Sequence, residues 1–166
     1  MVKKSSQNHL NIKDVGINAP ISFKKVGPDG NMPMPNSPDD VVCYDFSAFP
    51  GLGGKVGEYG NAIFSGHVDS GFDYCDYGKI PPPCMAVLWN LDKLTKGNEI
   101  NVFFDNKKFV YKIISNRIII PQGKAWNNVL KSTRNEIITV FTCAGEFNSE
   151  KYSYNKRQVV RAKRVL

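Results

Sequence analysis

The sequence predicts an all-β domain, a barrel or a sandwich, with little helix. Short runs rich in β-branched and aromatic residues alternate with turns rich in Gly, Pro, Asn and Asp along most of the chain. No repeat or linker divides the 166 residues, which are enough for one domain with its own core. Apolar residues make up 42% and charged residues 22%, a composition typical of a folded globular protein.

The first half of the chain contains several short strand patterns. Residues 11–23 (NIKDVGINAPISF) fit short strands separated by turns, and residues 41–46 (VVCYDF) fit a longer one. The glycine-rich stretch 49–60 lacks the GxxxxGK[ST] pattern of a phosphate-binding loop, so we interpret it as a loop only. A further strand is expected at 61–67.

The second half of the chain combines strands with two helical turns. The helical turns are expected at residues 86–94, where Trp89 would face the core, and at 126–130. A turn at residues 105–106 (Asp-Asn) would join two strands into a hairpin. The expected strands cover residues 99–105, 107–115, 117–120, 136–145 and 157–165.

The most informative stretch is residues 136–145 (EIITVFTCAG). An apolar, β-branched run carries Cys143 to its end and then breaks at glycine, which predicts that the thiol lies where a strand leaves the core. Side chains alternate along a strand, so Phe141 and Cys143 share one face and Thr142 points to the other. A nucleophile could meet a substrate at such a position.

Cys143 needs a partner to act as a nucleophile, because a free thiol with a pKa of about 8.5 is mostly protonated at neutral pH. His67 ends a predicted strand, whereas the other histidine, His9, lies in the N-terminal stretch. Arg157 begins the last predicted strand and is a permanently charged candidate to stabilise an oxyanion. A structural cysteine, a surface histidine and a solvated arginine fit the same pattern, and spacing alone leaves that choice open.

The four cysteines are not arranged in the CxxC pairs of a structural zinc site, so we expect no metal. Cys43, inside a predicted strand, is most simply a small buried residue. Cys75 and Cys84 bracket a proline-rich loop (YCDYGKIPPPC), which they could close in an oxidising compartment. The alternative is two independent thiols.

The net charge of +7 raises nucleic acid as a partner, but the Lys and Arg residues are scattered and no aromatic-basic motif accompanies them. We therefore expect no nucleic-acid partner, and proximity to an anionic cell surface is a simpler account of the charge. No apolar run approaches the roughly 20 residues of a membrane span, and residues 1–7 (MVKKSSQ) are too polar for a signal peptide.

Three motifs resemble those of the sortases. Residues 139–143 (TVFTC) resemble the TLxTC signature, with Val140 in place of leucine, and residues 65–69 (SGHVD) resemble the segment around the catalytic histidine. Residues 154–162 (YNKRQVVRA) resemble the closing RxVVxA strand. The motifs occur in the family's order, and the likeness covers residues 12–165. The GHVDS and CAGEFN versions of the histidine and cysteine segments are most similar to those of class F sortases.

The resemblance implies an eight-stranded sortase-type β-barrel with short helices and 3₁₀ turns. Residues 1–10 would form a flexible stub and residues 11–166 the catalytic domain. Such an enzyme cleaves an LPxTG-type sorting signal between threonine and glycine. By this resemblance Cys143 attacks the threonine carbonyl, His67 protonates the departing amine, and Arg157 holds the substrate and the oxyanion.

The resemblance also implies smaller roles and partners. Thr142 would help to place the substrate, and Asp69 would orient His67. The partners would be LPxTG-type surface proteins and an amine acceptor such as a cell-wall precursor, with no cofactor. No acidic cluster suggests calcium dependence. The family's N-terminal membrane anchor is absent from this chain, so we expect a soluble catalytic domain that works at the extracellular face of the bacterial cytoplasmic membrane.

Two other functions remain open at this stage. A thiol peptidase or hydrolase would use Cys143 and His67 with water as the acceptor. A non-catalytic extracellular β-barrel that binds a partner would keep Cys143 merely buried. An L,D-transpeptidase does not fit, because its histidine lies close before the cysteine in an SHGC-type motif and here Phe141 and Thr142 precede the thiol.

Overall fold

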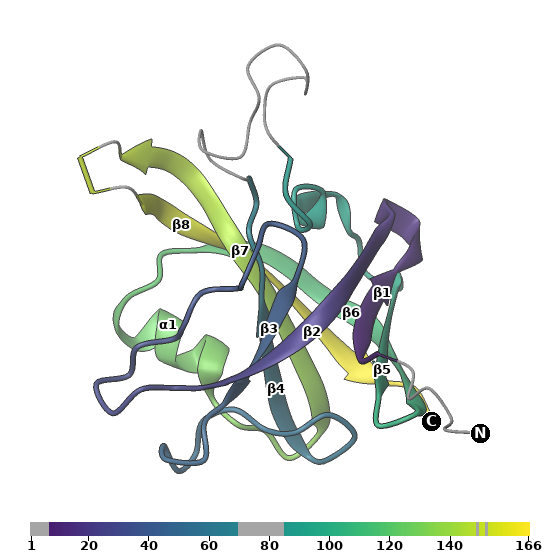
Figure 1. Cartoon of the computed structure of the whole chain (residues 1–166). Coiled ribbons are helices and arrows are strands. Elements are labelled where there is room, and N and C mark those ends of the chain that lie inside the picture. Colours follow the sequence, from purple (N-terminus) through teal and green to yellow (C-terminus); the bar gives the residue numbers. More distant parts are fainter. Residues whose placement is uncertain (1–6, 70–84, 149, 152) are drawn as a thin grey trace.

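The chain folds into a closed eight-stranded β-barrel, as predicted (Figure 1). This computed structural model describes residues 7–69, 85–148, 150–151 and 153–166. In chain order the elements are β1 (His9–Ile12), the 3₁₀ turn η1 (Lys13–Val15), β2 (Ile17–Lys25), β3 (Val41–Asp45), β4 (Gly60–Ser65), the 3₁₀ turn η3 (Leu91–Lys93), β5 (Glu99–Phe104), β6 (Lys107–Ile119), the helix α1 (Gly123–Leu130), β7 (Glu136–Asn148) and β8 (Ser153–Arg164). Around the barrel their order is β1-β2-β3-β4-β7-β8-β6-β5.

The barrel interior is filled by apolar side chains that alternate along the strands. Eight strands leave just enough interior space for such a filling. From β7, Ile138 and Val140 point inward and are completely buried. Around η3 the core contains Leu88, Leu91 and Leu94, which are spaced by one helical turn. Trp89, which the sequence predicts to face the core, is half-buried.

A second apolar cluster covers the outer face of β4, β7 and β8. It packs under α1, whose Trp126 ring meets the Phe141 ring edge-on with centroids 5.0 Å apart. The amide of Asn61, completely buried in β4, donates to the carbonyl oxygens of Val129 (2.9 Å) and Lys131 (3.0 Å) and so fixes the end of the helix. Figure 1 shows α1 alongside the barrel. This outer face is the one on which the odd-numbered residues of β7 lie.

Several element boundaries differ from the prediction. β7 does not end at Gly145 but continues to Asn148, because the polar residues that follow pair with the start of β8 in a two-stranded extension. The β6 segment is one continuous strand with a bulge rather than two strands. The hairpin turn at Asp105 and Asn106 is confirmed: both residues have positive φ, as a tight turn between twisted strands requires.

The first strand lies partly within the N-terminal segment. β1 begins at His9, inside residues 1–10, which were predicted to be a flexible stub. The His9 ring stacks on Phe103 with centroids 4.3 Å apart, and the next side chain, Leu10, is completely buried. These contacts explain why the chain is ordered there.

Candidate active site

The strand register pairs Cys143 with Arg157, and His67 follows the end of a neighbouring strand. β7 lies between β4 and β8 in the barrel. Cys143 and Arg157 are direct partners across the antiparallel β7–β8 pair. On the other side, Ser65 is the parallel partner of Phe141, and both His67 and Cys143 follow this pair by two residues.

Paired residues on adjacent strands point to the same face of a sheet, with the strands about 4.8 Å apart. The backbone N–H of Gly66 donates to the carbonyl oxygen of Phe141 at 3.4 Å, which closes the last pair of the ladder between β4 and β7. Cys143 and Arg157 therefore point to the same, outer face of the barrel, and His67 lies two residues beyond the end of the neighbouring strand β4. All three residues, which we call the row, are half-buried, and each comes from a separate sequence motif.

The Cys143 thiol lies in an environment that favours its protonated form. Burial raises its pKa, and the negative charge of Asp69 raises it further, while the positive charge of Arg157 opposes both effects. A thiol with a raised pKa forms little thiolate at neutral pH. Of these effects, only the positive charge of Arg157 favours the nucleophilic thiolate.

The Arg157 guanidinium is held by main-chain oxygens. Its Nη1 donates to the carbonyl oxygens of Tyr154 (3.0 Å) and Lys156 (2.8 Å). Within the described part of the chain both of its hydrogen bonds come from Nη1, which leaves Nη2 and Nε available to a substrate oxygen. This arrangement orients a fixed positive charge beside the thiol.

Thr142 does not lie on the same face as the thiol. Its side chain is only 3% exposed, and its hydroxyl donates to the carbonyl oxygen of Gly66 at 2.8 Å. Through this contact Thr142 ties β7 to the segment that carries His67, while its expected role in placing the substrate stays a prediction. The backbone of that segment is also held from the other side, where Leu88 N–H donates to the carbonyl oxygen of His67 at 3.0 Å.

Asp69 contacts a residue that the sequence analysis did not select. Its carboxylate accepts a hydrogen bond from the Tyr154 hydroxyl, which comes from the beginning of β8. Tyr154 is part of the motif at residues 154–162, but nothing in its spacing predicts a contact with the histidine segment. The expected role of Asp69 in orienting His67 remains a prediction.

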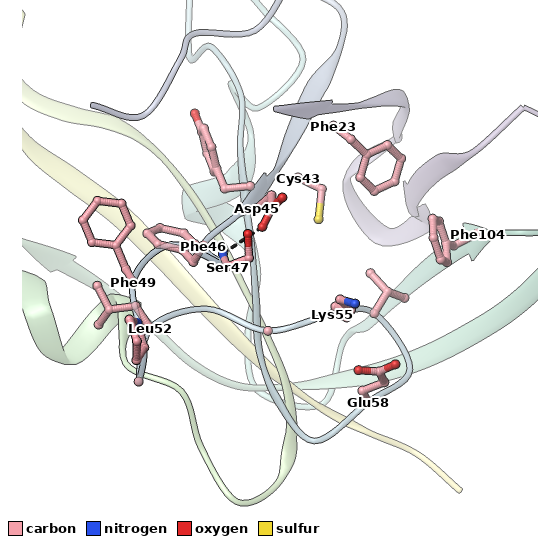
Figure 2. Close-up of a pocket in the computed structure, with 15 residues that line it drawn as sticks. Phe23, Cys43, Asp45, Phe46, Ser47, Phe49, Leu52, Lys55, Glu58 and Phe104 are labelled. Atoms are coloured by element: carbon pink, nitrogen blue, oxygen red, sulfur yellow. Dashed lines mark hydrogen bonds between the residues drawn. The ribbon is translucent and has the colours of Figure 1, made fainter. Parts of the chain in front are cut away.

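The other cysteine that the structure describes, Cys43, lies in the middle of β3, where it pairs with Phe64 of β4. It lines a cleft of about 800 Å³ among aromatic side chains such as Phe23 and Phe104 (Figure 2). The Cys43 side chain is 5% exposed, and burial together with the charge of Asp45 raises its pKa to about 12. Cys43 is therefore the small buried residue that the sequence predicted.

The structure does not test the expected pairing of Cys75 with Cys84. Both cysteines lie outside the described residues, so their pairing stays a prediction. Across residues 7–69, 85–148, 150–151 and 153–166, no group of three or more His, Cys, Asp or Glu side chains is placed to hold a metal ion. Over the same residues no helix is long and apolar enough to cross a membrane.

The fold and this row of residues define a β-barrel with a cysteine site on its outer face. Comparison with known protein families identifies it further: the sortase domain matches residues 10–165. Because the match covers nearly the whole chain, this protein belongs to the sortase family. A comparison with curated protein sequences finds no match.

Solved structures share the same fold. The sortase D5 transpeptidase of Clostridium perfringens superposes with a TM-score of 0.64 at 19% identity, over 96% of this chain and 79% of that one. A lid mutant of sortase A from Corynebacterium diphtheriae gives 0.67 at 17% identity, over 96% and 70%. Sortase A of Listeria monocytogenes gives 0.64 at 15% identity, over 98% and 89%. At these identities the likeness establishes the fold.

Proposed function

We propose that this protein is a sortase-type cysteine transpeptidase that cleaves an LPxTG-type sorting signal between threonine and glycine and transfers the acyl group to an amine. The observation that carries the proposal is the pairing of Cys143 with Arg157 across β7 and β8, with His67 two residues past the end of β4, the other neighbour of β7. The family membership and the three sequence motifs support the same function.

In the first step the thiolate of Cys143 attacks the carbonyl carbon of the substrate threonine. The carbonyl oxygen becomes an oxyanion, which the free N–H donors of Arg157 stabilise by charge-assisted hydrogen bonds. The bond to glycine then breaks, and His67 gives a proton to the departing amine. The product is a thioester between the threonine carbonyl and the Cys143 sulfur.

In the second step an amine attacks the thioester carbonyl. His67, now neutral, accepts the proton that the attacking amine loses, and the Cys143 thiolate leaves. Arg157 stabilises the second oxyanion as it did the first. A new amide bond forms and the enzyme returns to its starting state. Attack by water at this stage would instead give hydrolysis, which is the competing function.

The natural partners follow from this reaction. The acyl donors would be surface proteins with an LPxTG-type signal, and the acceptor would be an amine such as a cell-wall precursor, at the extracellular face of the bacterial cytoplasmic membrane. The GHVDS and CAGEFN segments favour a class F type of sortase. Membrane attachment through an N-terminal anchor belongs to this proposal as well.

The test is mass spectrometry of the protein with an LPxTG peptide, in the presence and absence of triglycine. We expect a thioester adduct on Cys143 and, with triglycine, a peptide product ligated to the amine. The variant His67→Ala tests the proton transfer assigned to His67. His9→Ala is its matched control, because His9 lies on β1, which is not adjacent to β4, β7 or β8. Hydrolysis that is insensitive to triglycine would favour the thiol hydrolase, and the absence of any adduct with LPxTG-type peptides would contradict the proposal.

A further inference from the structure

Tyr154 contacts Asp69 and Arg157, the two residues whose charges act on the Cys143 thiol. At one end, its hydroxyl donates to the carboxylate of Asp69, two residues after His67. At the other end, its main-chain carbonyl oxygen accepts a hydrogen bond from the Arg157 guanidinium at 3.0 Å. One side chain and its backbone therefore join the histidine segment to the arginine, on either side of Cys143.

The position of Tyr154 depends on how β7 and β8 extend beyond the site. The pairing shifts by a bulge between Ala144 and Phe147, and a bulge bends the strands and increases their twist. Gly145 lies in this bulge with φ of 81°, and a Cβ atom there would lie 2.2 Å from Oδ1 of Asn155. A residue other than glycine would therefore disturb the bend.

The Tyr154 ring is fixed by its neighbour across the strands. Phe147 is its direct partner, and the two rings lie 5.2 Å apart at a tilt of 55°. Burial and the nearby charge of Asp69 both raise the pKa of the Tyr154 hydroxyl, so it stays protonated and continues to donate. The hydroxyl thus has a fixed place and a fixed role as a hydrogen-bond donor.

The histidine segment, residues 66–69, is held in place by hydrogen bonds from several directions. Gly66 is held by Thr142, and the next two carbonyl oxygens, of His67 and Val68, accept hydrogen bonds from the N–H groups of Leu88 (3.0 Å) and Ala86 (3.2 Å). These bonds connect the segment to the barrel and to the stretch before η3. The hydrogen bond from Tyr154 to Asp69 connects it to β8, the strand that carries Arg157.

We propose that Tyr154 is a positioning residue, whose hydrogen bond to Asp69 couples the His67 segment to the Arg157 strand and so keeps both groups aligned with Cys143. This inference rests on the proposed transpeptidase function and adds a residue to it. Displacement of a catalytic group by about 1 Å can slow a reaction by about a hundredfold. Loss of the hydroxyl should therefore slow acylation without preventing folding.

The variant Tyr154→Phe removes the hydroxyl and keeps the ring that packs on Phe147. In single-turnover acylation by an LPxTG peptide we expect a fall of about tenfold or more in the acylation rate, with little change in the peptide concentration that half-saturates it. Tyr59→Phe is the matched control, because the Tyr59 side chain is 81% exposed on the loop between β3 and β4. Its acylation rate should match that of the original chain.

Substitutions of Asp69 distinguish the effect of its hydrogen bond with Tyr154 from the effect of its negative charge. Asp69→Asn keeps an oxygen that can accept from Tyr154, so we expect its acylation rate to stay within about threefold of the original. Asp69→Ala removes the acceptor and should match Tyr154→Phe. The double variant Tyr154→Phe/Asp69→Ala should be no slower than either single variant, because the two residues act as one unit. Rate losses that multiply, or no loss in Tyr154→Phe, would overturn the inference.

A second measurement needs no substrate and so separates this inference from the proposed function. In the free protein, amide exchange followed by NMR should be at least about tenfold faster at Ala86 and Leu88 in Tyr154→Phe, because the segment they bind has lost one of its attachments. The amide of Val165, which bonds to the carbonyl oxygen of Val110, is the control and should not change. If the original chain forms no acyl adduct, the proposed function fails, and the exchange rates alone test the coupling between Tyr154 and Asp69. Unchanged exchange at Ala86 and Leu88 in Tyr154→Phe would reject that coupling.

Discussion

The barrel holds two described thiols, Cys43 on β3 and Cys143 on β7, and the charges around them differ. Cys43 lines a roomy cleft, but it is surrounded by apolar side chains and by the negative charge of Asp45 (Figure 2). Cys143 lies on the outer face of the barrel beside the positive charge of Arg157, and His67 follows the end of the neighbouring strand β4. A cavity alone does not make a cysteine reactive.

The difference comes from the direction in which the two side chains point. Cys143 lies on the outer face of the barrel, where its cross-strand partner is the charged residue Arg157. Cys43 belongs to the apolar core cluster inside the barrel. The strand register therefore sets the surroundings of each thiol, and each prediction below changes one part of this contrast.

The largest expected effect is that of removing the reactive thiol. Cys143→Ala should reduce turnover of an LPxTG peptide by more than about a thousandfold, because no other group in the row can form the thioester. Product formation followed by chromatography measures this loss. Residual turnover above about one percent of the original rate would assign the nucleophile to another cysteine.

Arg157→Ala should lower the acylation rate by about a hundredfold, since one donor to an oxyanion contributes about that much. Arg164→Ala is the matched control on the same strand: its guanidinium pairs with Glu136 at 2.8 Å and lies over the Phe109 ring. That control should lose about 1–2 kcal/mol of unfolding free energy but keep its acylation rate. Equal losses of stability and rate in Arg157→Ala would make Arg157 structural.

Thr142→Val should have an intermediate effect, with acylation slower by about tenfold. The substitution keeps the shape of the buried side chain but removes the hydrogen bond to Gly66, which holds the histidine segment. Stopped-flow acylation and urea unfolding would be measured on the same samples. Thr142→Ser, which keeps the hydroxyl, should recover most of the rate; if it is as slow as Thr142→Val, the hydrogen bond is not the cause.

The pH dependence of alkylation should distinguish the two thiols. The pKa of Cys143 is raised, so its thiolate fraction and its rate with iodoacetamide should increase as the pH rises from about 6 to about 9. Cys43, with a pKa of about 12, should stay unmodified in the folded protein over this range. Arg157→Ala removes the effect that lowers the Cys143 pKa and should move its curve to higher pH, whereas Asp69→Asn should move it to lower pH. Shifts in the opposite directions would contradict this account.

Cys43→Ala should have the smallest effect on catalysis. The thiol acts as a small buried apolar group, so its loss should lower the unfolding free energy by about 1 kcal/mol. Turnover should stay within about twofold of the original rate. Peptide turnover and thermal unfolding measured side by side would check both values, and a large loss of turnover at unchanged stability would give the cleft a role in the reaction.

The sequence predicted the fold and the site where local patterns carry the information. Alternating apolar residues indicated the strands, and the motifs around His67, Cys143 and Arg157 indicated the residues that the register brings together. Side-chain alternation also placed Thr142 on the face opposite Cys143, although its contact with Gly66 could not be predicted. That contact joins residues distant in the chain.

The error at the end of the Cys143 strand has a clear physical origin. Gly145 was interpreted as a strand end, since glycine weakens strands, but it occupies a bulge within a longer pair. The polar residues after it pair because both faces of that extension meet water. Tyr154 therefore reaches Asp69 through a bend that no local pattern records.

The most direct test of the account uses a peptide that carries an LPxT sequence with a thiol-reactive ketone in place of the scissile amide. The modified cysteine is located by tandem mass spectrometry, and its labelling rate is compared between the original chain and His67→Ala. We expect labelling at Cys143, faster than with a scrambled peptide and slowed by loss of His67. Labelling at Cys43, or at Cys143 with no preference for the sequence and no dependence on His67, would contradict the claim that the row across β4, β7 and β8 is the active site.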